Sequence, residues 1–388
     1  MNPSQSPDAV PMTDIANITD AVWGPAAHKN ADAERALTLR SYLKCCNGEK
    51  GLALSRSSHL LDETPLSALI NTIKLERDKR KNELLNRASE SSIQGQLAAL
   101  DLAVRVAFMT ACAAASEETF GGDLFRPRWQ ANESLTAYIS RVYPHDDTPP
   151  QDVRPLRVDK LAMSYLTRYA SLELYWTHRL TDHLLLLKKA NRKILYVFRH
   201  PAFLRVSLDT LEASDPALGQ SISGALSLGC LPSQLLRETL ASYNLLFPEP
   251  GDETSRAILE REVSKHHLDP LLLQPFPSDY GVHEHPQDTL DPEDVRGLYK
   301  KYPYWADRLY ALWREADDPA PITSIDRWSE ARRNPRFTYW CTAVSLTIAI
   351  LFGMAATALG ALQVWISYCS WMNDPATPLC GRGPGKSN

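Results

Sequence analysis

The stretch from Thr338 to Trp371 reads TYWCTAVSLTIAILFGMAATALGALQVWISYCSW. It lies within a run from Phe337 to Asn373 that contains no Asp, Glu, Lys, Arg or His. The large aliphatic and Phe residues of this stretch favour membrane insertion by roughly 2.5 to 5 kcal/mol in sum, an advantage that one central Arg would cancel. We therefore predict a transmembrane helix over 338–366. The alternative is a buried core helix, although core helices of this length without a charge are rare.

Both ends of the predicted span carry the residue types that are typical of membrane interfaces. Aromatic side chains stand near each end, as expected of rings at the headgroup level. Four arginines precede the span, at 327, 332, 333 and 336, whereas Asp374 follows it. The positive-inside rule then places residues 1 to about 336 in the cytosol. The length from Trp340 to Ile366 suits a thick bilayer or a tilted helix, and a C-terminal tail without a strong basic cluster favours the secretory system or the plasma membrane.

Small residues recur about every four positions within the span, which indicates a face on which another helix could pack closely. We therefore expect self-association of the span as one option, although small residues are also common in membrane helices generally. The predicted packing face consists of Ala349, Gly353, Thr357, Gly360 and Ala361.

The net charge of −4 and a pI near 6.2 argue against a protein that coats nucleic acid. The charge is unevenly distributed, however. Residues 153–205 contain 11 Lys and Arg against 3 Asp and Glu, and residues 206–300 contain 6 against 16. Segments of opposite charge attract each other, so we expect them to pack in one domain.

The seven cysteines show no CxxC spacing, which favours a reduced cytosolic body over a disulfide framework. Cys369 and Cys380 follow the span, where a disulfide is chemically reasonable if that side is oxidising. Cys341 lies at the cytosolic edge, where palmitoylation is an alternative to a free thiol. The first residues lack a signal-peptide pattern, so we expect insertion after synthesis, as in tail-anchored proteins. The sequons at Asn17 and Asn132 should then stay unmodified.

The pattern along the chain predicts a mainly α fold. An α-helical periodicity covers much of residues 31–142, and an Asp- and Pro-rich stretch follows it. The apolar helix at 96–116 contains Asp101 and Arg105, which can pair, and is therefore expected to be buried and not a second span. The predicted organisation is a disordered N-terminus (1–30), a helical region (31–142), a Pro-rich linker (143–155), a helical domain with a hairpin (156–273), a loop (274–294), juxtamembrane helices (295–336), the transmembrane helix (338–366) and a C-terminal tail (367–388).

A β-hairpin is predicted at 183–200, HLLLLKKANRKILYVFRH, because two apolar runs flank a polar turn. Residues 158–176 before it have helical spacing, which gives the order of a winged-helix unit. The turn is basic and can contact anionic groups, either phosphates of nucleic acid or lipid headgroups. A membrane anchor favours lipid, or an acidic protein surface, over nucleic acid. The four basic residues are Lys188, Lys189, Arg192 and Lys193.

Patterns for catalysis are weak in this sequence. The chain lacks a Gly-x-Ser-x-Gly elbow, a phosphate-binding P-loop and a GxGxxG motif. His283, His285 and Asp288 have metal-ligand side chains, but neighbouring prolines indicate a loop without a rigid site, and His200, His266 and His267 lie elsewhere in the chain. Cys45 and Cys46 fit a helix end better than a reactive pair. We predict no catalytic, cofactor-binding or metal site, and no enzyme.

Several segments resemble a group of uncharacterised fungal single-pass membrane proteins with a helical cytosolic region. The likeness covers roughly residues 155–370. It is carried by DKLAMSYLTRYASLELYWTHRLTDHL from 159, RKILYVFRH from 192, YNLLFPEPGDET from 243, RRNPRFTYW from 332 and QVWISY from 363. The resemblance implies the anchor and a fungal origin, and it implies no functional residue.

The sequence thus predicts a C-terminally anchored, non-catalytic scaffold or adaptor with a cytosolic interaction domain. Its expected partners are the bilayer through 338–366, a cytosolic protein and a second copy of the span. The alternative functions are a membrane-active signalling or cell-death protein, which would permeabilise vesicles, and an enzyme, which would need an ordered metal or nucleophile.

Overall fold

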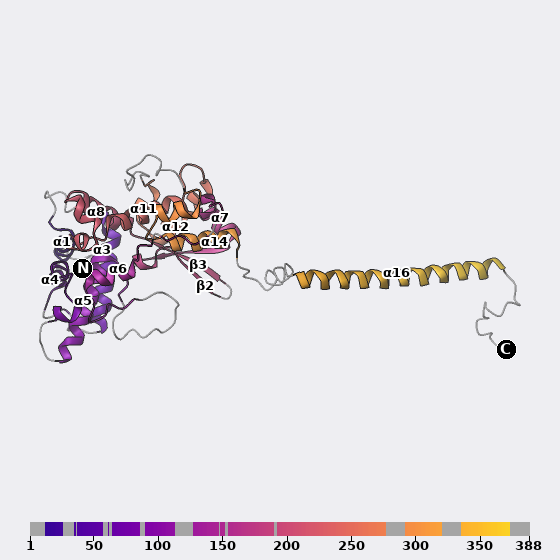
Figure 1. Cartoon of the computed structure of the whole chain (residues 1–388), viewed down its shortest axis with the longest axis horizontal. Coiled ribbons are helices and arrows are strands. Elements are labelled where there is room, and N and C mark those ends of the chain that lie inside the picture. Colours follow the sequence, from indigo (N-terminus) through magenta and orange to yellow (C-terminus); the bar gives the residue numbers. More distant parts are fainter. Residues whose placement is uncertain are drawn as a thin grey trace, which may run out of the picture. The chain divides into compact units, whose positions relative to one another are not determined.

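The computed structural model describes residues 12–25, 35, 37–56, 61, 64–85, 90–112, 127–146, 148–151, 154–189, 192–276, 292–319 and 335–372. The chain divides into two units, Met1–Ala320 and Pro321–Asn388. We call the described part of the first unit the body. Figure 1 shows the chain coloured along its sequence, with labels on those elements for which there is room.

The body is mainly helical, as the sequence predicted. Short 3₁₀ helices lie between several of its elements. Its α-helices are α1 (Met12–Trp23), α3 (Arg40–Arg56), α4 (Leu66–Leu75), α5 (Glu90–Phe108), α6 (Leu135–Val142), α7 (Met163–Tyr169), α8 (Pro201–Glu212), α9 (Pro216–Gln220), α10 (Ile222–Ser227), α11 (Ser233–Leu246), α12 (Glu253–His266), α13 (Val295–Lys301) and α14 (Ala306–Asp317).

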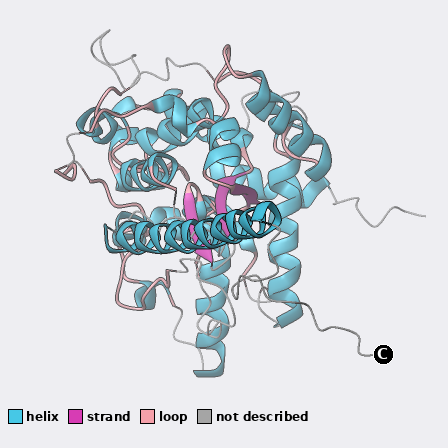
Figure 2. Ribbon diagram, turned by 90° about the vertical axis from the view of Figure 1, so that its right-hand side faces the viewer, coloured by secondary structure: helices cyan, strands magenta, loops and turns pink. Residues whose placement is uncertain are grey.

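A three-stranded sheet lies among these helices (Figure 2). Its strands are β1 (Leu172–Thr177), β2 (Leu185–Lys189) and β3 (Arg192–Phe198). β3 is central, antiparallel to β2 and parallel to β1. The β2–β3 hairpin is confirmed, but the helical interpretation of residues 172–176 is wrong. Leu172 and Trp176 share a face of a strand as well as of a helix, because four is an even number of residues, so their spacing does not distinguish the two.

The start of the chain is not disordered where the structure describes it. In α1, Val22 and Trp23 are buried in the main core. The Trp23 ring lies 5.4 Å from that of Tyr42 and 5.6 Å from that of Phe203. Its Nε1 donates to Ser207 Oγ at 3.0 Å. A buried indole with a satisfied N–H anchors this helix, so the disordered N-terminus predicted for 1–30 is wrong over 12–25, while 1–11 and 26–30 lie outside the described residues.

The Pro-rich stretch 143–155 does not separate two domains. It lies within the first unit, and its ends are bonded to that unit. The Asp146 backbone N–H donates to Pro303 O at 3.1 Å, and the buried Tyr143 ring lies 6.1 Å from that of Trp305. Leu156, just after the stretch, donates its N–H to Glu293 O at 2.9 Å. The described residues of this Pro-rich stretch are therefore part of the body and do not form a linker between domains.

The helices α13 and α14 belong to the body, and the rest of the predicted juxtamembrane segment, residues 320–334, lies outside the described residues. Pro303 separates the two helices, as the sequence predicted. The aromatic and aliphatic stripe of α14 is buried: Trp305, Leu309, Leu312 and Trp313 are each at most 2% exposed. In the second unit, the described residues form one helix, α16 (Pro335–Met372).

Candidate functional site

One described helix, α16, is long and apolar enough to cross a membrane, over Thr342–Trp371. Its apolar side chains are exposed rather than packed in a core. Trp365, Tyr368 and Trp371 lie exposed toward its C-terminal end, where the sequence predicted an interfacial belt. Exposed apolar surface along a whole helix is unfavourable in water and favourable in lipid. The predicted span 338–366 is therefore helical, and the helix continues to Met372.

The predicted packing face of α16 is open within the described residues. A Cβ added at Gly353 or Gly360 would meet nothing within 4 Å. The one polar side chain of this face is satisfied inside the helix, since Thr357 Oγ1 donates to Gly353 O at 2.7 Å. The face can thus approach another helix closely without an unpaired hydroxyl.

The four basic residues of the hairpin do not form one exposed patch. Lys193 is 4% exposed and its Nζ lies 2.5 Å from Glu315 Oε1. Lys188, its cross-strand neighbour, pairs with Glu315 Oε2. Lys189 and Arg192 are exposed, and Arg192 Nε lies 3.9 Å from a Glu173 carboxylate oxygen. The interpretation as an anionic-surface contact is therefore wrong for Lys193, and Lys188 uses its charge within the body.

Two acidic partners of the basic segment lie on α14, beyond the acidic segment that the sequence suggested. Glu315 pairs with two lysines of the hairpin. Asp317 forms ion pairs with Lys160 Nζ at 2.6 Å and with Arg154 Nη1 at 3.0 Å. Opposed lysines repel each other across a ladder, and the buried Glu315 carboxylate between Lys188 and Lys193 offsets one of their two positive charges. These contacts fix α14 onto the sheet.

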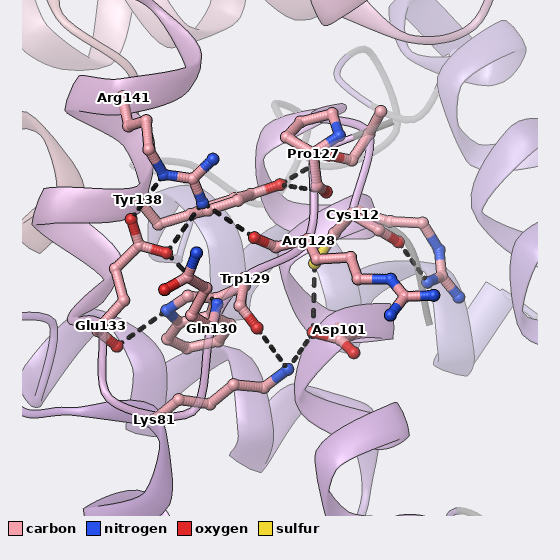
Figure 3. A network of polar contacts seen from close by, with 12 residues as sticks. Lys81, Asp101, Cys112, Pro127, Arg128, Trp129, Gln130, Glu133, Tyr138 and Arg141 are labelled. Atoms are coloured by element: carbon pink, nitrogen blue, oxygen red, sulfur yellow. Dashed lines mark hydrogen bonds and ion pairs between the residues drawn. The ribbon is translucent and has the colours of Figure 1, made fainter. Parts of the chain in front are cut away.

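A second buried charge pair joins Lys81 to Asp101 of α5 (Figure 3). Cys112 Sγ donates to Asp101 Oδ1 at 3.1 Å, and Lys81 Nζ lies 5.0 Å from the Trp129 ring centroid. Burial raises the pKa of Asp101, and the Lys81 charge opposes that shift. Asp101 therefore does not pair with Arg105 as predicted. Arg105 Nε binds Glu49 Oε2 at 3.0 Å instead, and α5 is a buried core helix as expected.

The same network ties down the segment before α6. Arg141 binds the Glu133 carboxylate with Nε at 2.8 Å and Nη2 at 2.9 Å, and Nη2 also donates to Arg128 O (Figure 3). Tyr138 Oη donates to Ala111 O at 2.6 Å. The Glu133, Tyr138 and Arg141 side chains thus have partners within the protein, so this network has a structural role.

A third cluster brings together Cys45, His178 and His200 from three elements. Cys45 lies on α3, His178 follows β1, and His200 precedes α8 after β3. One ligand-type atom from each lies within 4.8 Å of the others, and His178 Nδ1 is 2.9 Å from His200 Nε2. His200 is buried, Cys45 is half-buried and His178 is exposed. The cluster thus opens to solvent on the His178 side.

The cluster is electrostatically neutral in the absence of a cation. Partial burial of its ring lowers the pKa of His178 to about 4, and burial also lowers the pKa of His200, with the Arg199 charge contributing to both shifts. Burial raises the pKa of the Cys45 thiol to about 12, and the Glu49 charge acts in the same direction. The imidazoles are therefore uncharged at neutral pH and keep nitrogen lone pairs. Among the described residues, the buried His200 Nδ1 has no hydrogen-bond partner.

Sequence reasoning did not find this cluster. In the sequence alone, Cys45 and His200 stand out only as unrelated residues, and His178 does not stand out as a site residue. The histidines that sequence reasoning did consider together, His283 and His285, lie outside the described residues, as does Asp288. The missing signal was the parallel pairing of β1 with β3, which places the residues after both strands at one edge.

A groove of 1160 Å³ lies between α7, the end of α11 and the loop 247–252. Tyr169, Arg168 and Phe247 line it. Two of its polar groups already have partners: Asn244 Nδ2 donates to Phe276 O at 2.9 Å, and Ser164 Oγ donates to Asp252. The walls are thus pre-formed, with aromatic surface available for contact.

Comparison with known proteins gives no relative from which to carry over a site. The fungal resemblance therefore remains a prediction, and function must be inferred from this chain's own residues. No protein-family model matches the chain, and searches of curated proteins and of solved structures also give no match.

Proposed function

We propose that this protein is a single-pass membrane protein that holds its helical body at the cytosolic face of a bilayer and acts as a non-catalytic adaptor. The observation that carries the proposal is α16, a continuous helix whose apolar side chains are exposed over Thr342–Trp371. Burying such a helix in lipid satisfies every backbone polar group internally. Tethering then raises the local concentration of whatever the body binds.

Two observations support a cytosolic body. The arginines at 327, 332, 333 and 336 precede the span, and such residues stay in the cytosol. The body cysteines Cys45, Cys46, Cys112 and Cys230 are free, whereas Cys369, toward the other end of α16, is disulfide-bonded. Free thiols on one side and a disulfide on the other fit a reducing cytosol and an oxidising far side.

Alkaline carbonate extraction of membranes that contain the full chain tests the anchor. We expect the native chain to stay in the pellet. Arginines at Ala356 and Leu359, near the middle of the span, each disfavour insertion by about 2.5 to 3.5 kcal/mol, so the A356R/L359R variant should move to the wash. Ala356→Leu is the matched control and should pellet like the native chain. Release of the native chain would contradict the anchor.

Dye release from vesicles separates an adaptor from a membrane-active protein. An adaptor with one apolar helix and no exposed charged face on that helix should leave vesicles sealed after reconstitution. The native chain and the Ala356→Leu variant should both give the leakage of empty vesicles. Leakage that rises with the amount of reconstituted chain would contradict the adaptor function while leaving the anchor intact.

A further inference from the structure

We propose that Cys45, His178 and His200 form a binding site for a divalent transition-metal ion, with zinc as the expected ion. Thiolate sulfur and imidazole nitrogen are the ligand types that Zn²⁺ prefers in proteins. Three protein ligands leave the fourth position of a tetrahedron to water, on the side where His178 is exposed. The site is independent of the membrane anchor and lies within the body.

The fold brings the ligands together through the parallel pair β1 and β3. Thr177 is registered with Phe198 at the last rung of the ladder. His178 is the first residue after that rung on its segment, and His200 is the second on the other. Arg199 N–H, just before His200, donates to Thr177 O at 3.0 Å, which fixes the two chain segments relative to each other. The two imidazoles therefore meet at the carboxyl edge of the sheet, where α3 supplies Cys45.

The observed separations are close to those of a coordinated ion. In a tetrahedral zinc site two nitrogen ligands lie roughly 3.4 Å apart, and sulfur and nitrogen roughly 3.6 Å apart. The His178 Nδ1 to His200 Nε2 distance is 2.9 Å, and all three ligand atoms lie within 4.8 Å of one another. Rotation of the exposed His178 ring and the Cys45 side chain covers differences of this size without moving the backbone.

A bound cation would have to stabilise the Cys45 thiolate, because the surroundings favour the protonated thiol. Coordination requires the Cys45 thiol to lose its proton, which passes to solvent, and the resulting thiolate and two neutral imidazoles leave the zinc complex with one positive charge. Glu49, one helical turn from Cys45 on α3, raises the pKa of the free thiol and is already paired with Arg105, so the bound cation itself must stabilise the thiolate. Arg199 Nη2 donates to His266 O at 3.1 Å, so this guanidinium is held by the end of α12.

The alternative use of the same geometry is a hydrogen bond between two neutral imidazoles with a thiol nearby. That arrangement needs no ion and gives no thiolate. A metal ion with a visible spectrum distinguishes the two, because Co²⁺ occupies zinc sites and gives a thiolate-to-cobalt charge-transfer band only when sulfur is a ligand.

The experiment uses the full chain in detergent micelles, purified without a histidine tag, stripped with a chelator and titrated with Co²⁺. We expect one Co²⁺ per chain with a charge-transfer band, which added Zn²⁺ displaces. His178→Ala should weaken binding at least about tenfold, since it removes a ligand. Cys45→Ser should abolish the charge-transfer band. His145→Ala is the matched control, because His145 is exposed and lies outside the cluster.

Circular dichroism of each variant reports whether it folds, and the exposed position of His178 makes His178→Ala the variant least able to disturb the core. A second readout is the melting temperature, which Zn²⁺ should raise for the native chain and for His145→Ala but not for folded His178→Ala. A native chain that gives no charge-transfer band would overturn the site. So would equal Co²⁺ affinities for the native chain and His178→Ala.

Discussion

Lys193 Nζ lies 2.5 Å from Glu315 Oε1, with both side chains buried where the hairpin meets α14. Removing the carboxylate from this contact leaves the Lys193 charge buried without a partner, and removing Lys193 leaves the carboxylate with Lys188 alone, so either change destabilises the fold. The contact also decides how the hairpin charges are used, because a lysine held in the body is not available to a membrane surface.

Glu315→Gln should therefore destabilise the body by about 3 kcal/mol, since it leaves Lys193 buried without a counter-charge. Lys188 is half-exposed and can turn to water. The measurement is the free energy of unfolding of the full chain in detergent micelles. Lys189→Gln, at an exposed neighbouring position, is the control and should change stability by less than about 0.5 kcal/mol. A double variant, Glu315→Leu with Lys193→Leu, should lose less than Glu315→Gln.

Gly229→Ala should be among the most damaging single-methyl changes. Gly229 has φ 75°, and its added Cβ would lie 1.9 Å from Val22 O, which accepts from Lys74 Nζ at 2.7 Å. The left-handed backbone and the clash together suggest a loss of roughly 3 kcal/mol. Gly48→Ala in α3 is the matched control: its Cβ meets nothing within 4 Å, so it should gain about 0.5 to 1 kcal/mol. Thermal unfolding of both variants is the measurement.

Asp252 should link stability to pH. It caps α12, accepting from the Thr254 and Ser255 backbone N–H groups at 3.1 Å each. Partial burial raises its pKa, but hydrogen bonds from Ser164 and Ser255 outweigh burial and leave the pKa below 3.8. A folded pKa below the unfolded one stabilises the fold above pH 3.8, and this contribution is lost as pH falls through the folded value.

Asp252→Ala should thus lose about 1 to 2 kcal/mol at neutral pH, and the difference from the native chain should shrink below pH 3.8. Asp252→Asn, which keeps the cap but not the charge, should lose less. Unfolding curves across the acid range measure both. A constant difference between Asp252→Ala and the native chain down to the lowest pH would assign the loss to packing alone.

The small-residue face of α16 predicts an effect on self-association. Gly353→Leu should reduce the dimer fraction of the full chain in micelles, measured by energy transfer between differently labelled copies, because a bulky side chain keeps the helix axes apart. Ala355→Leu adds a side chain of the same size on the opposite side of the helix and should leave the dimer fraction unchanged. Equal effects of the two substitutions would contradict this face.

Features that are local in sequence were predictable. The uncharged run from Phe337 to Asn373 identified α16 through composition alone, and the polar turn between two apolar runs identified the β2–β3 hairpin. Pro303 correctly separated α13 from α14. Each of these signals lies within one short window, where periodicity and turn chemistry act.

Features that depend on distant segments were not predictable. The third strand was missed because the spacing of Leu172 and Trp176 fits a helix and a strand equally. Lys81 lies in a strongly charged stretch of the sequence, where nothing local distinguishes a buried lysine from a solvated one, yet the fold buries it against Asp101. Cys45, His178 and His200 come from separate parts of the sequence: the pairing of β1 with β3 brings the two histidines together, and the packing of α3 adds Cys45.

Protease protection in sealed vesicles tests the central claim, a cytosolic body on one span, most directly. The full chain carries one epitope before Met1 and another after Asn388, and protease is added outside vesicles with their cytosolic face outward. We predict loss of the N-terminal epitope and survival of a short C-terminal fragment that contains α16. Protection of the N-terminal epitope and the body, with loss of the C-terminal epitope, would contradict the account.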